Sequence, residues 1–85
     1  MSVRIVYFAW VRERIGKGSE EIDLPDTVKT VGDLIAHLST FGEEYAAVFE
    51  VPQVIRAAID EEHADHDEVL GSAREIALFP PMTGG

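Results

Sequence analysis

The sequence predicts an α+β domain with a mixed sheet of four to five strands, one face of which is covered by a single central helix. Runs of β-branched and aromatic residues lie near both ends of the 85-residue chain, and one amphipathic segment lies between them. A chain of this length has room for a single hydrophobic core. Its 46% apolar residues are also too many for a disordered protein. We therefore expect one folded domain.

The first half of the chain predicts two strands separated by a helical turn. Residues 3–8 are β-branched and aromatic, and residues 9–15 have less β character and reach Gly16, so we expect a short helical turn there. Residues 20–24 alternate polar and apolar, as in a half-buried strand, and Pro25 ends them. The first strand then has two faces, one with Val3, Ile5 and Tyr7 and the other with Arg4, Val6 and Phe8.

The central helix is predicted to begin at Thr30. This threonine can cap the helix, and Asp33 three residues later completes a pattern close to a capping box. We expect Gly42 to end the helix. The apolar stripe at i, i+3, i+4 and i+7 consists of Val31, Leu34, Ile35 and Leu38.

The second half of the chain predicts the remaining strands. We expect a helical turn at residues 45–49 that Pro52 ends, a strand at residues 54–59 and a last strand at residues 75–79. The acidic residues 60–68 are expected to form a solvated turn with room for one short edge strand. This order is a β-grasp layout, in which the first and last strands are central neighbours. The sheet would bury Ile5, Tyr7, Ile22, Leu24, Ile76 and Leu78 against Leu34 and Leu38.

The sequence ends in a segment of unusual composition, Phe79-Pro80-Pro81-Met82-Thr83-Gly84-Gly85. The two prolines favour extended backbone at themselves and at the preceding residues. Gly84 and Gly85 have no Cβ and can enter a narrow cleft. We therefore expect residues 1–79 to form a single β-grasp domain and residues 80–85 a flexible tail that ends in a carboxylate.

A second apolar stripe is predicted on the face of the sheet that the helix leaves uncovered. Large apolar patches are rare on monomers, so this stripe indicates a protein-docking surface at the root of the tail. Docking there would direct Gly85 into the partner. We expect the partner to contact Val6, Phe8, Ala77 and Phe79, together with Pro80, Pro81, Met82 and Thr83.

Charge and composition narrow the possible partners. Sixteen acidic and seven basic residues give a net charge of −9, which disfavours nucleic acid and anionic membranes and favours a partner with a basic surface. The apolar residues 5–11 lead directly into Arg12-Glu13-Arg14 without a cleavage site, so we expect a cytoplasmic protein. The absence of cysteine excludes disulfides, thiolate metal sites and a cysteine nucleophile.

No catalytic site within the chain is predicted. His63 and His66 lie in an acidic loop that we expect to be hydrated and free of metal, and His37 is expected at the surface beside the helix stripe. Gly16-Lys17-Gly18 is too short for a phosphate-binding loop. The remaining group is the carboxylate of Gly85, which is ionised at neutral pH and must be activated before it can accept sulfur or an amine. Because the chain has no ATP site and no other bound cofactor is expected, a separate enzyme would supply that step.

The ending of the chain, preceded by the strand residues Glu75-Ile76-Ala77-Leu78, resembles the small subunit of molybdopterin synthase. The opening Val6-Tyr7-Phe8-Ala9-Trp10-Val11-Arg12-Glu13 also resembles that family. The resemblance implies a ubiquitin-like β-grasp sulfur carrier whose Gly85 is adenylated with ATP by an activating enzyme and converted to a thiocarboxylate by a sulfur donor system. It further implies a heterotetramer with a large catalytic subunit, into which the tail delivers sulfur to cyclic pyranopterin monophosphate to form molybdopterin. In that assembly Gly84 permits entry of the tail, and Phe8 and Phe79 anchor the interface.

One stretch departs from the family, and three other functions remain open. Residues 60–66 are more acidic than the Asn-containing turn usual there, which affects the details of partner contact. The chain could instead carry sulfur for thiamine synthesis or tRNA thiolation, or be a protein modifier conjugated through Gly85. It could also be a plain β-grasp binding module with an incidental tail. Deleting Gly84 and Gly85 would leave such a module fully functional.

Overall fold

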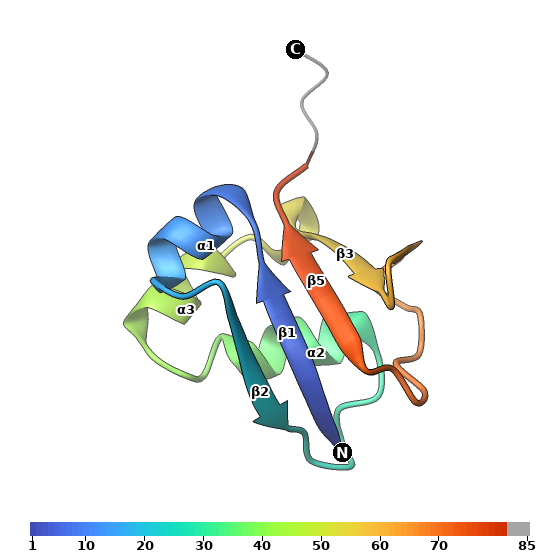
Figure 1. Cartoon of the computed structure of the whole chain (residues 1–85). Helices are drawn as coiled ribbons and strands as arrows, with labels where there is room; N and C mark the ends of the chain where they lie inside the picture. Colours follow the sequence, from blue (N-terminus) through green and yellow to red (C-terminus); the bar gives the residue numbers. More distant parts are fainter. Residues whose placement is uncertain (82–85) are drawn as a thin grey trace.

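The computed structural model, which describes residues 1–81, contains one mixed sheet with the strand order β2-β1-β5-β3-β4 (Figure 1). β1 and β5 are parallel, and every other neighbouring pair is antiparallel. The first and last strands are therefore central neighbours, as predicted. The strands are β1 (Ser2–Tyr7), β2 (Ser19–Asp23), β3 (Arg56–Ile59), β4 (Glu62–Ala64) and β5 (Glu75–Phe79).

The alternation of β1 sets the two faces of the sheet. Val3, Ile5 and Tyr7 are buried on the face that α2 (Val31–Leu38) covers, while Val6 is half-buried on the opposite face. Figure 1 shows α2 behind the sheet, crossing β1 and β5. Every residue predicted for the core is buried: Ile5, Tyr7, Ile22, Leu24, Ile76 and Leu78 from the sheet side, and Leu34 and Leu38 from the helix.

The predicted capping box at the start of α2 is present. The Asp33 backbone N–H donates to Thr30 Oγ1 at 3.1 Å, and the Thr30 N–H donates to Asp33 Oδ2 at 3.2 Å. The predicted end of this helix at Gly42 is wrong, because α2 ends at Leu38. The hydroxyls of Ser39 and Thr40 donate to the carbonyls of the last turn, and Gly42 instead lies at the N-terminus of α3 (Glu43–Val48).

The other helical segments lie at the ends of the strands. α1 (Ala9–Ile15) ends, as predicted, at Gly16, whose φ of 89° gives the left-handed C-cap. α3 packs against α1. Pro52 does not end α3 as predicted; it begins a 3₁₀ turn, η1 (Pro52–Val54). The strand predicted for residues 54–59 therefore begins only at Arg56. Within residues 1–81, no helix has the length and apolar character needed to cross a membrane.

A tight hairpin joins β3 to β4, the short edge strand anticipated in the acidic segment. Its two loop residues, Asp60 and Glu61, have φ values of 47° and 74°, typical of a type I′ turn that favours Asn-Gly. Asp60 fits because its Oδ1 accepts the backbone N–H groups of Arg74 and Glu75, both at 3.0 Å. Glu61 makes no such bond among the described residues.

We expect Glu61→Gly to stabilise the protein by about 1 kcal/mol, because glycine adopts a positive φ without the Cβ clash of glutamate. Chemical denaturation of both proteins measures this difference. Glu62→Gly is the matched control, since residue 62 is extended strand and should be destabilised by glycine. Equal effects at the two positions would contradict the turn assignment.

A polar cluster that the sequence did not reveal ties α3 to the sheet. Glu20 Oε2 accepts hydrogen bonds from the hydroxyls of Tyr7 at 2.8 Å and Tyr45 at 2.7 Å, and Lys17 Nζ lies 3.3 Å from Glu20 Oε1. Burial raises the pKa of the Tyr7 phenol, and its hydrogen bond to Glu20 raises it further. Burial alone would also raise the pKa of Glu20. Bonds from Tyr45, Tyr7 and Lys17 outweigh that effect and hold its pKa below the ordinary value.

We expect Glu20→Gln to lower the free energy of unfolding at pH 7 by about 1–2 kcal/mol, because charge-assisted hydrogen bonds are lost. The folded-state pKa of Glu20 lies below the ordinary 4.5. The stabilisation is therefore fully present above about pH 4.5 and is lost as the pH falls through the lowered pKa. Denaturation curves from pH 3 to pH 7, with exposed Glu21→Gln as control, measure this. A deficit that persisted unchanged at the lowest pH would contradict the role of the charge.

Candidate functional site

The residues predicted to dock a partner converge on the sheet face that lies opposite α2. Cα pairing places Val6 beside Ala77, and the next step of the same register places Phe8 beside Phe79. Residues directly opposite on neighbouring strands share a face of the sheet. We call Val6, Phe8, Ala77 and Phe79 the tail-root patch, since β5 leads directly into Pro80 and Pro81 (Figure 1).

Phe8 is the most exposed member of the tail-root patch. Phe8 is 48% exposed, while Val6, Ala77 and Phe79 are half-buried, as are Pro80 and Pro81. An exposed phenylalanine flanked by half-buried apolar residues is typical of an anchor for a partner protein. The predicted contacts at Met82 and Thr83, and the chemistry predicted for Gly84 and Gly85, lie outside the described residues.

Phe8 is held firmly although its ring is exposed. Its backbone N–H donates to the Leu78 carbonyl at 3.1 Å, and its carbonyl accepts the Arg12 N–H at 3.3 Å as α1 begins. Ala9 has a φ of 53°, so the chain turns sharply immediately after Phe8. The Phe8 backbone is thus fixed by β5 on one side and α1 on the other, which sets the point from which its ring projects.

The same sheet face becomes polar with distance from the tail. Arg4 lies in register between Glu21 and Glu75, and its Nε is 4.0 Å from Glu75 Oε1. Ser2 Oγ donates to Glu21 Oε2 at 3.0 Å. An apolar centre beside a charged margin is the usual composition of a protein–protein interface. The tail end of the face is therefore the part suited to burial.

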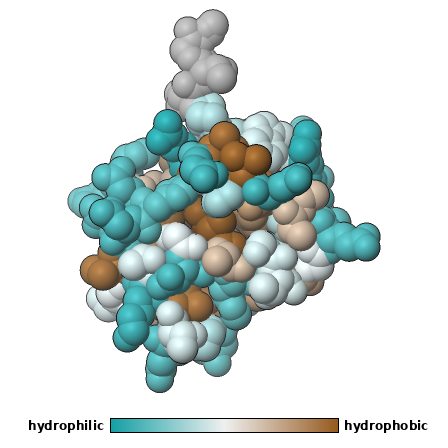
Figure 2. Space-filling model, turned by 180° about the vertical axis from the view of Figure 1, so that it is seen from behind, coloured by the Kyte–Doolittle hydropathy of each residue, from teal (hydrophilic) through white to brown (hydrophobic). Residues whose placement is uncertain are grey.

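The helix-covered side of the molecule has a different surface. Figure 2 shows hydrophilic residues around the margin of this side, with apolar areas below the tail and in the middle and smaller ones elsewhere. Phe41, in the connection that follows α2, is 40% exposed, and its ring lies 5.2 Å from that of His37 and 5.4 Å from that of Tyr45. His37 is half-buried in this stack rather than free at the surface.

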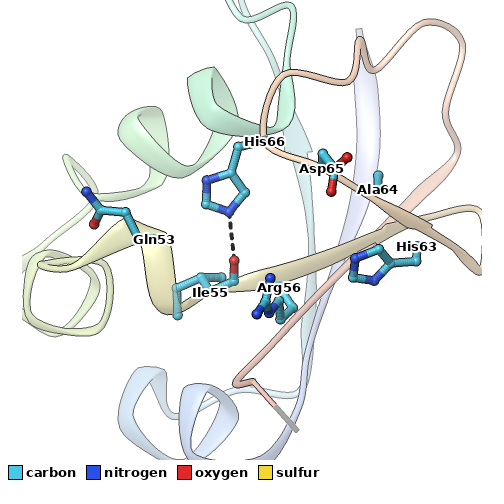
Figure 3. Close-up of a pocket in the computed structure, with 7 residues that line it drawn as sticks. All are labelled: Gln53, Ile55, Arg56, His63, Ala64, Asp65 and His66. Atoms are coloured by element: carbon cyan, nitrogen blue, oxygen red, sulfur yellow. Dashed lines mark hydrogen bonds between the residues drawn. The ribbon is translucent and has the colours of Figure 1, made fainter.

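A pocket of about 250 Å³ lies beside the tail-root patch, between η1 and the β3–β4 edge (Figure 3). His66 forms part of its wall: Nε2 donates to the Ile55 carbonyl at 2.7 Å, which fixes the ring. The lining residues are Gln53, Ile55, Arg56, His63, Ala64, Asp65 and His66. In the part of the chain that the structure describes, no three His, Asp or Glu side chains are grouped so as to hold a metal ion.

Comparison with known proteins connects this geometry to a family. A protein-family model described as "ThiS family" matches residues 5–85. The chain belongs to the ThiS family. Its relatives include the molybdopterin synthase sulfur carrier subunit of Escherichia coli (strain K12), 32% identical over 98% of this chain and 99% of that protein. The corresponding subunit of Dictyostelium discoideum is 37% identical over 96% of this chain and 94% of that protein.

Solved structures of ubiquitin-like β-grasp proteins have the same fold as this ThiS-family chain. Haloferax volcanii SAMP1 matches with a TM-score of 0.72 and 26% identity, covering 100% of both chains. A putative molybdopterin converting factor, subunit 1, from Pyrococcus furiosus matches with a TM-score of 0.75 and 25% identity over 96% of this chain and 99% of that one. The resemblance to the small subunit of molybdopterin synthase and the predicted β-grasp fold are confirmed.

Sequence reasoning did not identify the pocket beside the tail-root patch. The sequence pattern places Arg56 in a strand and gives it no further role, and it marks His63 and His66 only as potential metal ligands. One signal was present in the sequence: Arg56 is the single charged residue in the otherwise apolar run of residues 54–59. A charge in such a run must lie on an open sheet face or at an edge.

Proposed function

We propose that this protein is the sulfur carrier subunit of molybdopterin synthase. The observation that carries the proposal is the end-to-end match to proteins of that name, together with a family match that continues to Gly85. The tail-root patch supports it, since a carrier needs a surface that positions its tail in a partner. The partner is the large subunit of molybdopterin synthase.

The proposed chemistry takes place at the Gly85 carboxylate. An adenylating enzyme joins this carboxylate to the AMP portion of ATP and releases pyrophosphate, which converts a poor electrophile into a reactive mixed anhydride. A sulfur donor system then displaces AMP and leaves a thiocarboxylate. In the large subunit, the thiocarboxylate sulfur is transferred to cyclic pyranopterin monophosphate, and the carboxylate is regenerated with oxygen from water. This chain itself binds no cofactor.

The fold supports this chemistry by positioning the tail. Phe8 and Phe79 would anchor the domain on the large subunit, while Pro80 and Pro81 favour an extended path into the active site. Gly84 and Gly85 would pass where a side chain would clash. The net charge of −9 would steer the chain toward a basic docking surface. We place this assembly in the cytoplasm, as a heterotetramer of two large and two small subunits.

The proposal is tested by reconstitution. The purified chain is incubated with ATP, an adenylating enzyme and a sulfur donor, and is then mixed with the large subunit and cyclic pyranopterin monophosphate. We expect molybdopterin to form in proportion to the carrier added. A thiocarboxylated carrier that yields no molybdopterin with the large subunit, yet supports thiamine synthesis or tRNA thiolation, would assign it to one of those pathways.

A protein-modifier role is the second candidate, because a solved structure titled small archaeal modifier protein 1, from H. volcanii, matches with a TM-score of 0.68 and 25% identity. A modifier would be found joined through Gly85 to lysines of other proteins. Tryptic peptide mapping of cell extracts distinguishes the two roles. Cleavage after Arg74 would leave residues 75–85 attached to each modified lysine. Such conjugates in the absence of thiocarboxylate would favour the modifier.

A further inference from the structure

Arg56 lies at the margin of the tail-root patch. Its Cα pairs with that of Phe79 across β3 and β5, so the two side chains project from the same sheet face. His63 faces the same side, since its Cα partner is Ala58, two residues along β3 from Arg56. Figure 3 shows Arg56 and His63 along the β3–β4 edge. A partner that covered Phe79 would therefore also meet Arg56.

The charge of Arg56 differs in its surroundings from that of Arg4, the other arginine on this face of the sheet. Acidic residues outnumber basic ones by 16 to 7, yet Arg56 is exposed and forms no ion pair with any residue among positions 1–81. By contrast, Arg4 on the same sheet face lies beside Glu75. Arginine is among the residues enriched at the energetic centres of protein interfaces.

The pocket next to Arg56 has the donors that a carboxylate requires. Arg56 contributes a planar guanidinium that can bind both carboxylate oxygens, and Gln53 and His63 add further N–H groups. His66 is already bonded to the Ile55 carbonyl and forms the wall. Asp65, also in the lining, repels any anion, but repels a doubly charged phosphate more strongly than a singly charged carboxylate. The volume of about 250 Å³ admits one acidic side chain.

We propose that the pocket formed by Gln53, Arg56 and His63 receives an aspartate or glutamate side chain of the large subunit when the tail-root patch docks. This inference rests on the proposed function, because it uses the same partner and extends the same interface. Paired with Arg56, that carboxylate fixes the rotation of the carrier about the tail. It thereby sets the direction in which the tail enters the active site of the large subunit. The large subunit would then present an acidic contact within an otherwise basic docking surface.

Charge reversal tests the proposal, because the local contact and the overall field predict opposite results. Arg56→Glu makes the chain more acidic. If only the overall field acted, attraction to a basic partner would make binding tighter or leave it unchanged. A specific carboxylate contact instead predicts a dissociation constant raised at least about tenfold. Lys29→Glu is the matched control, since it changes the charge equally in the loop before α2, where Lys29 lines a different pocket together with Met1. Isothermal titration calorimetry with the large subunit measures both variants, and thermal unfolding confirms that both are folded.

Each result decides one question. If the unaltered chain does not bind the large subunit, the proposed function is wrong. If it binds and Arg56→Glu binds as tightly as Lys29→Glu, the pocket proposal is wrong while the proposed function stands. If Arg56→Glu is poorly folded, Arg56→Gln replaces it, with a weakening of at least about fivefold expected. Binding by Arg56→Glu should be restored by changing one acidic residue of the large subunit to lysine, which identifies the carboxylate.

Discussion

Deleting Gly84 and Gly85 should abolish molybdopterin formation and leave the folded domain unchanged. The sulfur acceptor in the proposed chemistry is the Gly85 carboxylate, and a chain ending at Thr83 could place neither its new carboxylate nor its β-branched side chain in a cleft shaped for glycine. We expect activity below detection in the reconstituted reaction, a loss of at least about 10³-fold, since no other group in the chain can hold the sulfur.

The control for this deletion is a comparison of the thermal stability of the variant with that of the full chain. The described core lies entirely within residues 3–78, so the thermal midpoint should match that of the full chain. A deletion variant that still supported molybdopterin formation would contradict the carrier mechanism. It would indicate instead a binding module whose tail is incidental.

Phe8→Asp should raise the dissociation constant for the large subunit by about 100-fold or more. An aspartate at the centre of a desolvated apolar contact loses hydration without gaining a partner, and truncated interface anchors commonly lose 2–4 kcal/mol. Because Phe8 is 48% exposed and its backbone makes the hydrogen bonds to Leu78 and Arg12, the substitution should leave stability nearly unchanged. Calorimetric titration with the large subunit measures the effect.

Phe41→Asp is the matched control for Phe8→Asp. Phe41 is similarly exposed, at 40%, but lies in the connection between α2 and α3, away from the tail-root patch. We expect its dissociation constant to stay within about threefold of the original, since it is outside the interface. Equal weakening by both variants would place the docking surface elsewhere.

The elements that the sequence predicted well are those governed by local patterns. The two-residue period of a strand placed Val3, Ile5 and Tyr7 on one face of β1, and the structure buries that face. The Thr30–Asp33 capping box located the start of α2 to the residue. The tail-root patch followed from the same logic, because once α2 covers one face the remaining apolar positions of β1 and β5 must lie on the other.

The features that the sequence did not predict depend on side-chain hydrogen bonds that no residue pattern marks. Gly42 looked like a helix end, but Ser39 and Thr40 bond to the last carbonyls of α2 and end it a full turn earlier. The alternation of residues 20–24 indicates only that Glu20 is a polar position of a strand. Its partner Tyr45 lies 25 residues away, and no local pattern connects them.

Arg56 illustrates the same limit at the candidate site. Its pocket is assembled from η1, β3 and β4, and its proximity to Phe79 depends on the pairing of β3 with β5. The sequence could mark Arg56 as an isolated charge, but only the sheet register places it beside the tail.

Intact mass spectrometry of the protein isolated from its own cells tests the central claim most directly. A sulfur carrier should contain a fraction of molecules heavier by the difference between one sulfur and one oxygen, with fragmentation assigning the change to Gly85. Incubation with ATP, an adenylating enzyme and a sulfur source should increase that fraction. A carboxylate that stays unmodified under both conditions would contradict the proposal that this ThiS-family chain carries sulfur.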